Sequence, residues 1–199
     1  MALNSALIDS TLAEKTVLEE ISFEVRGTER LLISGDNGSG KTTLLKLLTN
    51  QWQPDSGEIK IGPNVNIGYF AQEHEVLNLE KTVLDEFLST ERLQLGSRNP
   101  RNVLGNFLFR SDEVYKQVKD LSLGQRVRLI FAKLMNQKNE LLILDEPTNH
   151  LDIASKESVE QALKQYQGAM IVVSHDRYFL EKIEITSQLV LEQGRIKRV

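Results

Sequence analysis

The pattern of hydrophobic and polar positions predicts strands that alternate with helices along most of the chain. Ile21–Val25 alternates apolar and polar side chains, as a half-buried strand does. Arg30–Ser34 is a short apolar run that indicates a buried strand, and Lys41–Thr49 follows it as a helix. The later expected elements are strands at Glu58–Ile61, Asn66–Phe70, Glu140–Leu144 and Ala169–Ser174, helices at Gly124–Met135 and Ile153–Tyr166, and a hairpin of Gln188–Leu191 with Arg195–Lys197. This order predicts an α/β fold with a mostly parallel sheet covered on both faces.

A helical stretch from Glu80 to Val118 interrupts this alternation. Its apolar residues recur at helical spacing, and Gly96 to Pro100 breaks it, so we expect two or three short helices there. Earlier in the chain, Pro54-Asp55-Ser56-Gly57 predicts a turn. The pattern therefore predicts one domain, with a core in residues 1–72 and 122–199 and a small helical subdomain inserted over residues 73–121.

Composition narrows the classes of protein that this chain can belong to. It has 199 residues, 40% of them hydrophobic and 26% charged, which is ordinary for a globular protein with one sizeable core. Its net charge of −4 gives no bulk attraction to nucleic acid or anionic membranes and argues against a DNA-binding module. The absence of cysteine excludes disulfides and thiolate zinc sites, and fits a cytoplasmic location.

No stretch of this sequence has the length and character of a signal peptide or a membrane span. The first residues, MALNSALIDS, lack a basic start and an apolar core of signal-peptide length. The longest apolar run, Ala169–Val173, is far shorter than the ~20 residues needed to cross a bilayer. We therefore expect no direct membrane insertion of this chain.

A glycine-rich loop follows the apolar strand that ends at Ser34 and opens the next helix. It matches the pattern G-x-x-x-x-G-K-[ST], in which backbone N–H groups cradle phosphates at a helix N-terminus. Lys41 would reach the β- and γ-phosphates of a nucleoside triphosphate, and the Thr42 hydroxyl would bind Mg²⁺. The expected nucleotide-binding residues are Gly35, Asp36, Asn37, Gly38, Ser39, Gly40, Lys41, Thr42 and Thr43.

Two carboxylates end the apolar strand that begins near Leu141. A buried parallel strand would deliver Asp145 and Glu146 to the carboxyl edge of the sheet, where ligands bind in open α/β folds. There Asp145 is placed to hold Mg²⁺ and Glu146 to polarise an attacking water. The three histidines, His74, His150 and His175, have a spacing that matches no metal-ligand motif.

Together these residues resemble the nucleotide-binding domain of the ATP-binding cassette (ABC) superfamily, from about Thr16 to the C-terminus. The resemblance implies a P-loop ATPase fold with an antiparallel β subdomain and a helical subdomain. It assigns Gln72 to a loop that contacts Mg²⁺ and the attacking water, Asp152 to the D-loop, and His175 to the γ-phosphate. The signature that acts on the ATP of an opposite domain would be Ser122, Leu123, Gly124 and Gln125.

Within the superfamily, the segments Glu146–Asp152 and Ser174–Leu180 resemble the ABC-F branch. Members of that branch carry two such domains on one chain, have no membrane domain, and mostly act on ribosomes, some of them protecting ribosomes from antibiotics. The run from Leu104 to Val118 resembles the second of the two domains. The resemblance thus implies that this chain is part of a larger tandem protein, whose contacts with the ribosome lie largely outside it.

The sequence departs from the family pattern in two places. Leu123 stands where the signature usually has its first glycine, and Ser122 and Gly124 keep the contacting elements, so we expect the cap on the partner domain's phosphate to survive, with the bulk of Leu123 as the feature that could weaken it. No aromatic residue precedes Phe23, although many members stack one on adenine, so GTP stays an alternative to ATP.

The main hypothesis is an ATPase in which ATP and Mg²⁺ join two domains head to tail, within one polypeptide or a homodimer. Hydrolysis, with Glu146 as base and His175 and Gln72 assisting, would release them, and an isolated domain would hydrolyse ATP weakly. Two alternatives stay open: the ATPase subunit of a membrane transporter, and a switch that binds ATP without hydrolysing it. The presence of Glu146 and His175 disfavours the second.

Overall fold

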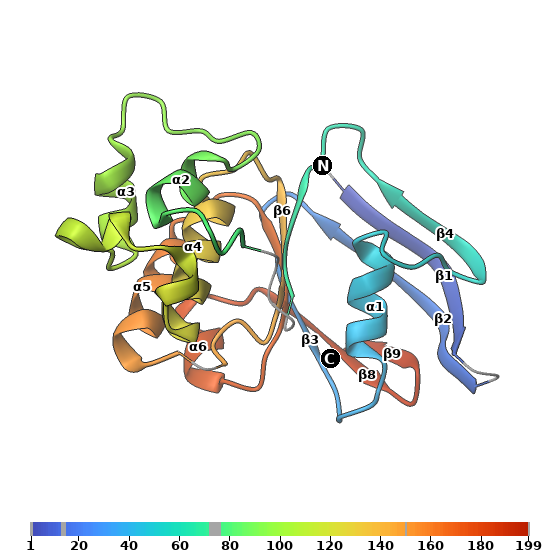
Figure 1. Ribbon diagram of the computed structural model, residues 1–199. Helices are drawn as coiled ribbons and strands as arrows, with labels where there is room; N and C mark the ends of the chain where they lie inside the picture. Colours follow the sequence, from blue (N-terminus) through green and yellow to red (C-terminus); the bar gives the residue numbers. More distant parts are fainter. Residues whose placement is uncertain (1, 13–14, 72–76, 150, 199) are drawn as a thin grey trace.

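The computed structural model describes residues 2–12, 15–71, 77–149 and 151–198. Its elements form two sheets and two groups of helices (Figure 1). The strands are β1 (Ala2–Leu12), β2 (Lys15–Arg26), β3 (Arg30–Ser34), β4 (Ser56–Ile61), β5 (Ile67–Phe70), β6 (Leu141–Asp145), β7 (Ala169–Val173), β8 (Ser187–Glu192) and β9 (Arg195–Arg198). The helices are α1 (Lys41–Leu48), α2 (Val83–Leu88), α3 (Pro100–Asn106), α4 (Leu123–Met135), α5 (Ile153–Lys164) and α6 (Arg177–Lys182), with 3₁₀ turns at Ser111–Tyr115 and Val118–Asp120.

The central sheet has six strands in the order β5-β6-β7-β3-β8-β9, and every pair in it is parallel except β8–β9. Every residue of β6 and β7 is buried, because helices or a second sheet cover both faces. Alternate side chains of these strands enter two different hydrophobic clusters, as the period of a strand requires. The sheet is thus the shared wall of two cores.

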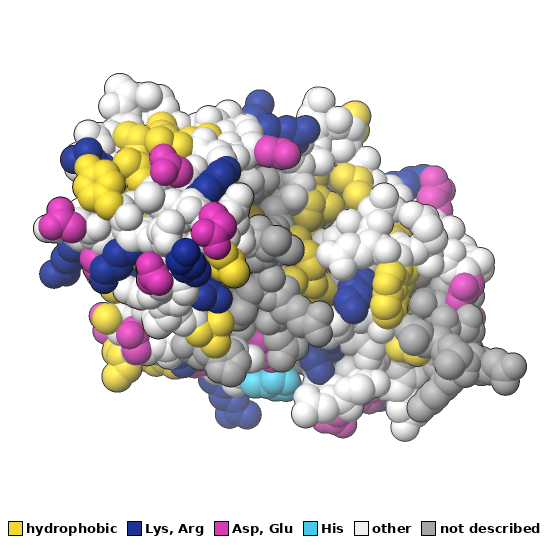
Figure 2. Space-filling model, viewed as in Figure 1, with side chains coloured by type: hydrophobic (Ala, Val, Ile, Leu, Met, Phe, Trp, Pro, Cys, Tyr) yellow, Lys and Arg dark blue, Asp and Glu magenta, His cyan; other side chains and the backbone are white. Residues whose placement is uncertain are grey.

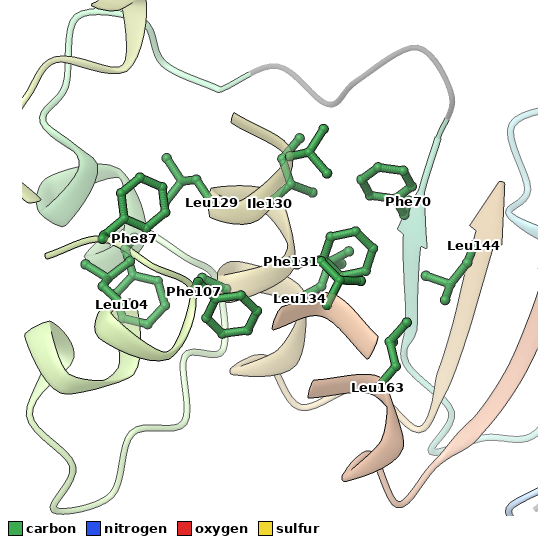
Figure 3. Packing of buried hydrophobic residues seen from close by; sticks show 14 of the residues in the cluster. Phe70, Phe87, Leu104, Phe107, Leu129, Ile130, Phe131, Leu134, Leu144 and Leu163 are labelled. Atoms are coloured by element: carbon green, nitrogen blue, oxygen red, sulfur yellow. The ribbon is translucent and has the colours of Figure 1, made fainter. Parts of the chain in front are cut away.

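One face of the central sheet packs against α1, which lies between it and the antiparallel sheet β2-β1-β4 (Figure 1). The other face packs against α4, α5 and α6. Phe131 of α4 stacks on Phe70 of β5, with ring centroids 4.8 Å apart (Figure 3). This core continues outward to α2 and α3 through Phe87 and Leu104, so the helices of residues 83–120 rest on α4.

A buried ion pair also ties this helical segment to α4. The Glu86 carboxylate of α2 is 3% exposed, and it accepts a hydrogen bond from Lys133 of α4. A carboxylate buried to this degree requires such a partner. Because Ser122 caps the N-terminus of α4, this contact and the aromatic core fix the position of the signature segment.

The sequence predicted the type of most elements correctly. The strand at Arg30–Ser34 and the alternation of Ile21–Val25 are confirmed, the latter within the longer β2. The turn expected over Pro54–Gly57 ends two residues earlier than predicted, because β4 begins at Ser56 and pairs with β1. The sequence analysis missed β1 and α6. The strand β1 is stabilised by ladders to both β2 and β4, and α6 is a helix of only six residues.

On the face drawn in Figure 2, basic and acidic side chains are interspersed over the helical half of the molecule. Among the described residues, the helical half of this face therefore offers no extended patch of one charge. None of the helices in the described ranges is long and apolar enough to cross a bilayer.

Candidate phosphate-binding site

The loop between β3 and α1 has a backbone that only glycine can adopt at two positions. Gly35 has φ +150°, and a Cβ there would lie 2.2 Å from the carbonyl oxygen of Leu191. Gly40, the residue before α1, has φ +105°, and its Cβ would lie 2.8 Å from a methyl group of Leu18. Any side chain at either position would therefore push the loop off β8 or β2. The loop is a tight curl at the N-terminus of an eight-residue helix.

Polar groups in this loop are arranged around its inner surface. The Lys41 ammonium donates hydrogen bonds to the carbonyl oxygens of Gly35 at 2.8 Å and Asp36 at 2.9 Å, across the curl. The Ser39 hydroxyl is buried and has no hydrogen-bond partner among the described residues. A buried polar group usually has a partner, so this hydroxyl suits a ligand with acceptor oxygens. The loop opens on a cavity of about 620 Å³.

The carboxylate of Asp145 lies at the end of β6 beside the loop, where it is 2% exposed. The Thr42 hydroxyl donates a hydrogen bond to Asp145 Oδ2 at 3.5 Å. Burial raises the pKa of Asp145, and the adjacent negative charge of Glu146 raises it further. The Thr42 hydrogen bond and the nearby Lys41 oppose this increase in part. The raised pKa indicates that the protein itself does not fully compensate the negative charge of the Asp145 carboxylate.

Glu146 is held in a strained backbone conformation at the next position. Its φ is +49°, the left-handed region that a non-glycine residue seldom adopts. Its N–H donates to the carbonyl oxygen of Val173 at 2.8 Å, and its own carbonyl accepts from Asn149 at 3.2 Å. These bonds maintain the strain and direct the carboxylate toward His175, whose Nε2 lies 3.5 Å from Glu146 Oε1. Strain of this kind is frequent at functional sites.

The segment that carries His175 is fixed by its neighbour Asp176. This carboxylate accepts hydrogen bonds from Lys156 of α5 at 2.9 Å and from the N–H of Phe179 at 3.0 Å. The hydrogen bond with Lys156 lowers the pKa of Asp176 most, followed by that with Phe179. Asp176 thus begins α6 and anchors the loop, while the His175 side chain stays 62% exposed. An exposed imidazole anchored in this way can reach a ligand in the cavity.

The predicted signature segment does not line this cavity. Ser122 precedes α4 and forms a reciprocal capping pair with Gln125, whose side chain also donates to Glu113 at 3.3 Å. Leu123 is 42% exposed. Asp152 likewise caps α5, through a 2.7 Å bond from the N–H of Ser155. The segments at Ser122 and Asp152 thus present the N-termini of α4 and α5 at the surface, away from the phosphate loop.

Three residues that the sequence analysis did not assign to the site contribute to its lining. Val17 of β2, Asn149 and Val173 of β7 lie along the cavity with the loop and the two acids. Asn149 follows the acidic strand end closely enough that its proximity could have been inferred. Val17 had no such signal, because it reaches the cavity only through the folding of β2 beside the loop. Gln72, His74 and His150 lie outside the described residues.

The donor set fits a nucleoside triphosphate with a divalent cation. Successive N–H groups of the curl, Lys41 and the α1 N-terminus suit phosphate oxygens. The Thr42 hydroxyl and the Asp145 carboxylate are oxygen ligands of the kind that Mg²⁺ takes beside substrate phosphates. A bound cation would also supply the positive charge that balances the buried carboxylate of Asp145.

A strand–loop–helix that cradles anions, beside a parallel strand ending in two acids, defines the fold class as a P-loop NTPase. A model of the ABC transporter family matches residues 18–149. The chain therefore belongs to this family as an ABC ATPase domain, and it binds ATP.

Comparisons with known proteins agree. The chain is similar to the ATP-binding protein YdiF of Bacillus subtilis (50% identical over 91% of this chain and 28% of the relative). It is also similar to the ABC transporter F family member 5 of Arabidopsis thaliana, with 42% identity over 94% of this chain and 27% of the relative. The ribosome protection protein VmlR of Bacillus subtilis is 36% identical over 96% of this chain and 34% of the relative. The chain thus spans about a third of the length of these relatives.

The fold is also that of a solved structure described as an ATP-binding subunit of an ABC transporter. The two superpose with a TM-score of 0.82 over 99% of this chain and 88% of that one, at 22% sequence identity.

Asp145→Asn should raise the free energy of unfolding at neutral pH in the absence of nucleotide. Because the pKa of Asp145 is raised on folding, ionisation of this carboxyl opposes folding. That cost is present above the raised pKa and disappears below the ordinary aspartate value of about 3.9. Urea unfolding at a series of pH values should therefore show a stabilised variant at pH 7 and a shrinking difference as the pH falls through this window.

Asp152→Asn is the matched control, because hydrogen bonds from Ser155 lower the pKa of Asp152. This variant should gain no stability at neutral pH. An Asp145→Asn variant that is less stable than the parent at pH 7 would contradict the burial argument.

Proposed function

We propose that this domain hydrolyses ATP with Mg²⁺ and that hydrolysis opens a head-to-tail pair of two such domains. The observation that carries the proposal is that the phosphate loop, Asp145, Glu146 and His175 line one cavity. The sequence places these residues on three distant segments, and each has a role in phosphoryl transfer to water.

In this proposal the loop from Gly35 to Thr43 binds the phosphates through its N–H groups, and Lys41 turns its ammonium from the loop carbonyls to the β- and γ-phosphates. Thr42 and Asp145 hold the cation, together with Gln72. When bound, Mg²⁺ neutralises charge on the transferred phosphoryl group. Among the residues of the chain, Lys41 does the same.

Glu146 accepts the proton of the attacking water. Its carboxylate is only 15% exposed and its backbone is fixed at both the N–H and the carbonyl, so its position relative to the cavity is well defined. His175 lies within reach of both that carboxylate and the cavity, and it hydrogen-bonds the γ-phosphate and orients the water. Positioning of this kind accounts for much of the catalysis of phosphoryl transfer.

The exposed N-terminus of α4 supports a role for a second domain. Ser122, Leu123, Gly124 and Gln125 lie apart from the cavity of their own copy, and in this proposal they cap the γ-phosphate of a partner. A 13-residue helix brings a partial positive charge to that phosphate. Asp152 lies in the loop before α5 and would meet the partner there. In this arrangement residues 73–121 form a helical subdomain that ends next to the signature, and residues 1–72 and 122–199 form the nucleotide-binding core.

The sequence pattern of the acidic turn and the names of several relatives favour an ABC-F role on the ribosome. One relative is named as a ribosome protection protein and another as an ABC transporter F family member. We therefore place the domain in a cytoplasmic tandem protein that acts as a translation factor or protects ribosomes from antibiotics. Val17, an aliphatic side chain, lines the cavity, so base selectivity between ATP and GTP is weak in this proposal.

Glu146→Gln should retain ATP binding and lose hydrolysis by at least about a hundredfold, the usual contribution of a general base. Because uncleaved ATP keeps the domains together, the variant should also form ATP-dependent dimers in analytical ultracentrifugation. Phosphate release is the primary measurement, and Glu157→Gln, which alters an exposed acid of α5, is the control. A Glu146→Gln variant with the parent rate would remove Glu146 from the mechanism. A parent that binds ATP but releases no phosphate would instead support a non-hydrolytic switch.

The full-length protein carrying Glu146→Gln should pellet with ribosomes in the presence of ATP and not in its absence. ATP closes the domain pair, and the closed form is the one expected to bind. Sedimentation through a sucrose cushion measures this, with Lys41→Ala, which removes the phosphate contact of this domain's own site, as the control. Absence of pelleting with intact ATP binding would favour the ATPase subunit of a membrane transporter.

A further inference from the structure

A second cavity, of about 510 Å³, lies at the opposite edge of the central sheet from the phosphate loop. Its lining includes Asn139 and Gly168, which precede β6 and β7, whereas the phosphate site lies where these strands end. The two cavities share no lining residue. In this fold ligands usually bind at the carboxyl edge of the sheet, so the second cavity belongs to a different site.

The walls of this cavity come from three helices and the loop before β7. The C-terminal half of α3 faces that of α5, and the end of α4 forms the floor with Met135 and Asn136. Phe107 and Val103 contribute apolar surface next to the core drawn in Figure 3. Tyr166 contributes a second ring, fixed by a 3.0 Å hydrogen bond from its hydroxyl to the carbonyl oxygen of Asn139.

Side-chain amides dominate the polar lining. Gln161, Gln165 and Gln167 are exposed at the rim, while Asn136 is 4% exposed. Among the described residues, no carboxylate lines the cavity and Arg98 is its one charged residue; its guanidinium donates from Nε to the carbonyl oxygen of Leu95 at 3.1 Å and from Nη2 to that of Gln94 at 2.7 Å. The six amides are Asn106, Asn136, Asn139, Gln161, Gln165 and Gln167. Such a lining offers both donors and acceptors, disfavours cations, and has one position suited to an anionic group.

Asn136 lines the cavity and carries a buried acceptor without a partner among the described residues. Its Nδ2 donates to the carbonyl oxygen of Ala132 at 2.8 Å, but its Oδ1 is buried and has no partner among the described residues. Exchanging the amide atoms would leave the carbonyl of Ala132 facing an oxygen, so the assignment stands. A buried acceptor without a donor is costly, and a ligand N–H group would remove that cost.

We propose that this cavity binds a nucleobase that carries a phosphate, with the base between the helices and the phosphate at Arg98. Asn and Gln side chains pair with the edges of bases through two hydrogen bonds, and a guanidinium pairs with phosphate oxygens. The rings of Phe107 and Tyr166 supply apolar surface for the base. A base and its sugar fit within the volume of an ordinary ligand pocket.

The convergence of the amides favours a compact ring over an extended peptide. Asn106 of α3, Asn136 at the end of α4 and Gln161 of α5 approach one volume from three directions. A peptide main chain offers its polar groups in a line and would match amides along one groove. The base has two sources, a free mononucleotide and single-stranded RNA. This inference does not rest on the proposed ATPase cycle.

Amide chemical shifts in NMR test the inference, with a non-hydrolysable ATP analogue and Mg²⁺ saturating the phosphate loop. The probes are CMP, AMP, cytidine, single-stranded RNA tetranucleotides and a blocked tetra-alanine peptide. Nucleotides should shift resonances of the residues around the cavity, and CMP should bind more tightly than cytidine. Tighter binding of RNA than of CMP identifies RNA as the source, and equal binding identifies a free nucleotide; both outcomes support the site.

Variants separate binding from folding. Asn136→Leu removes the buried acceptor, and Gln161→Ala removes a rim amide; each should weaken nucleotide binding about tenfold, as loss of one good hydrogen bond does. Arg98→Ala should weaken CMP about tenfold and leave cytidine unchanged. Gln53→Ala, an exposed amide outside the cavity, is the control, and urea unfolding verifies that each variant is folded.

Three results would overturn the inference. The first is the absence of shifts around the cavity with any nucleotide at millimolar concentration. The second is nucleotide binding that is unchanged in Gln161→Ala and Arg98→Ala, both of which alter exposed residues. The third is binding of the peptide without binding of nucleotides.

Discussion

The burial of the parallel strands on both faces is the constraint from which the rest of the structure follows. Since β3, β6 and β7 run in the same direction, their ends meet at one edge. Polar residues cannot continue inside such strands, so they begin where each strand leaves the core. Gly35, Asp145 and Ser174 lie at these strand ends, where the chain enters the loops of the phosphate site. The proximity of residues more than a hundred positions apart is thus a consequence of strand direction.

The parts that the sequence predicted are those specified by local patterns. A continuous apolar run indicates a buried strand whatever its partners, and Gly35 to Thr43 carries the backbone requirement of the curl within nine residues. The acids at Asp145 and Glu146 could be placed because the strand before them was unambiguous. These features needed no knowledge of distant contacts.

The parts that it did not predict depend on contacts remote in sequence. The strand β1 pairs with β4 across more than forty residues, and Val17 reaches the cavity only because β2 packs beside the loop. The left-handed backbone of Glu146 is held by Val173 from another strand. The second cavity is formed by three helices and includes a buried amide, and none of these carries a sequence motif. Tertiary packing decides such features, and a single sequence offers no local signal for them.

The helix α4 connects two regions of the molecule, because its two ends lie in different surroundings. Its N-terminus is exposed at Ser122, while its C-terminus is the floor of the second cavity at Asn136. The aromatic core holds the middle of the helix to residues 83–120, and Glu86 holds its last turn through Lys133. The signature segment and the second cavity are thus built on the same helix.

The central claim is that one complete ATPase site needs the phosphate loop of one domain and the signature of another. Mixing Lys41→Ala with Ser122→Arg tests it most directly, with phosphate release measured for each variant alone and for the mixture. The account predicts two inactive variants and a mixture that recovers about a quarter of the parent rate, because half of random pairs combine the two and each holds one intact site. A mixture no more active than its components, with both variants folded, would contradict the account.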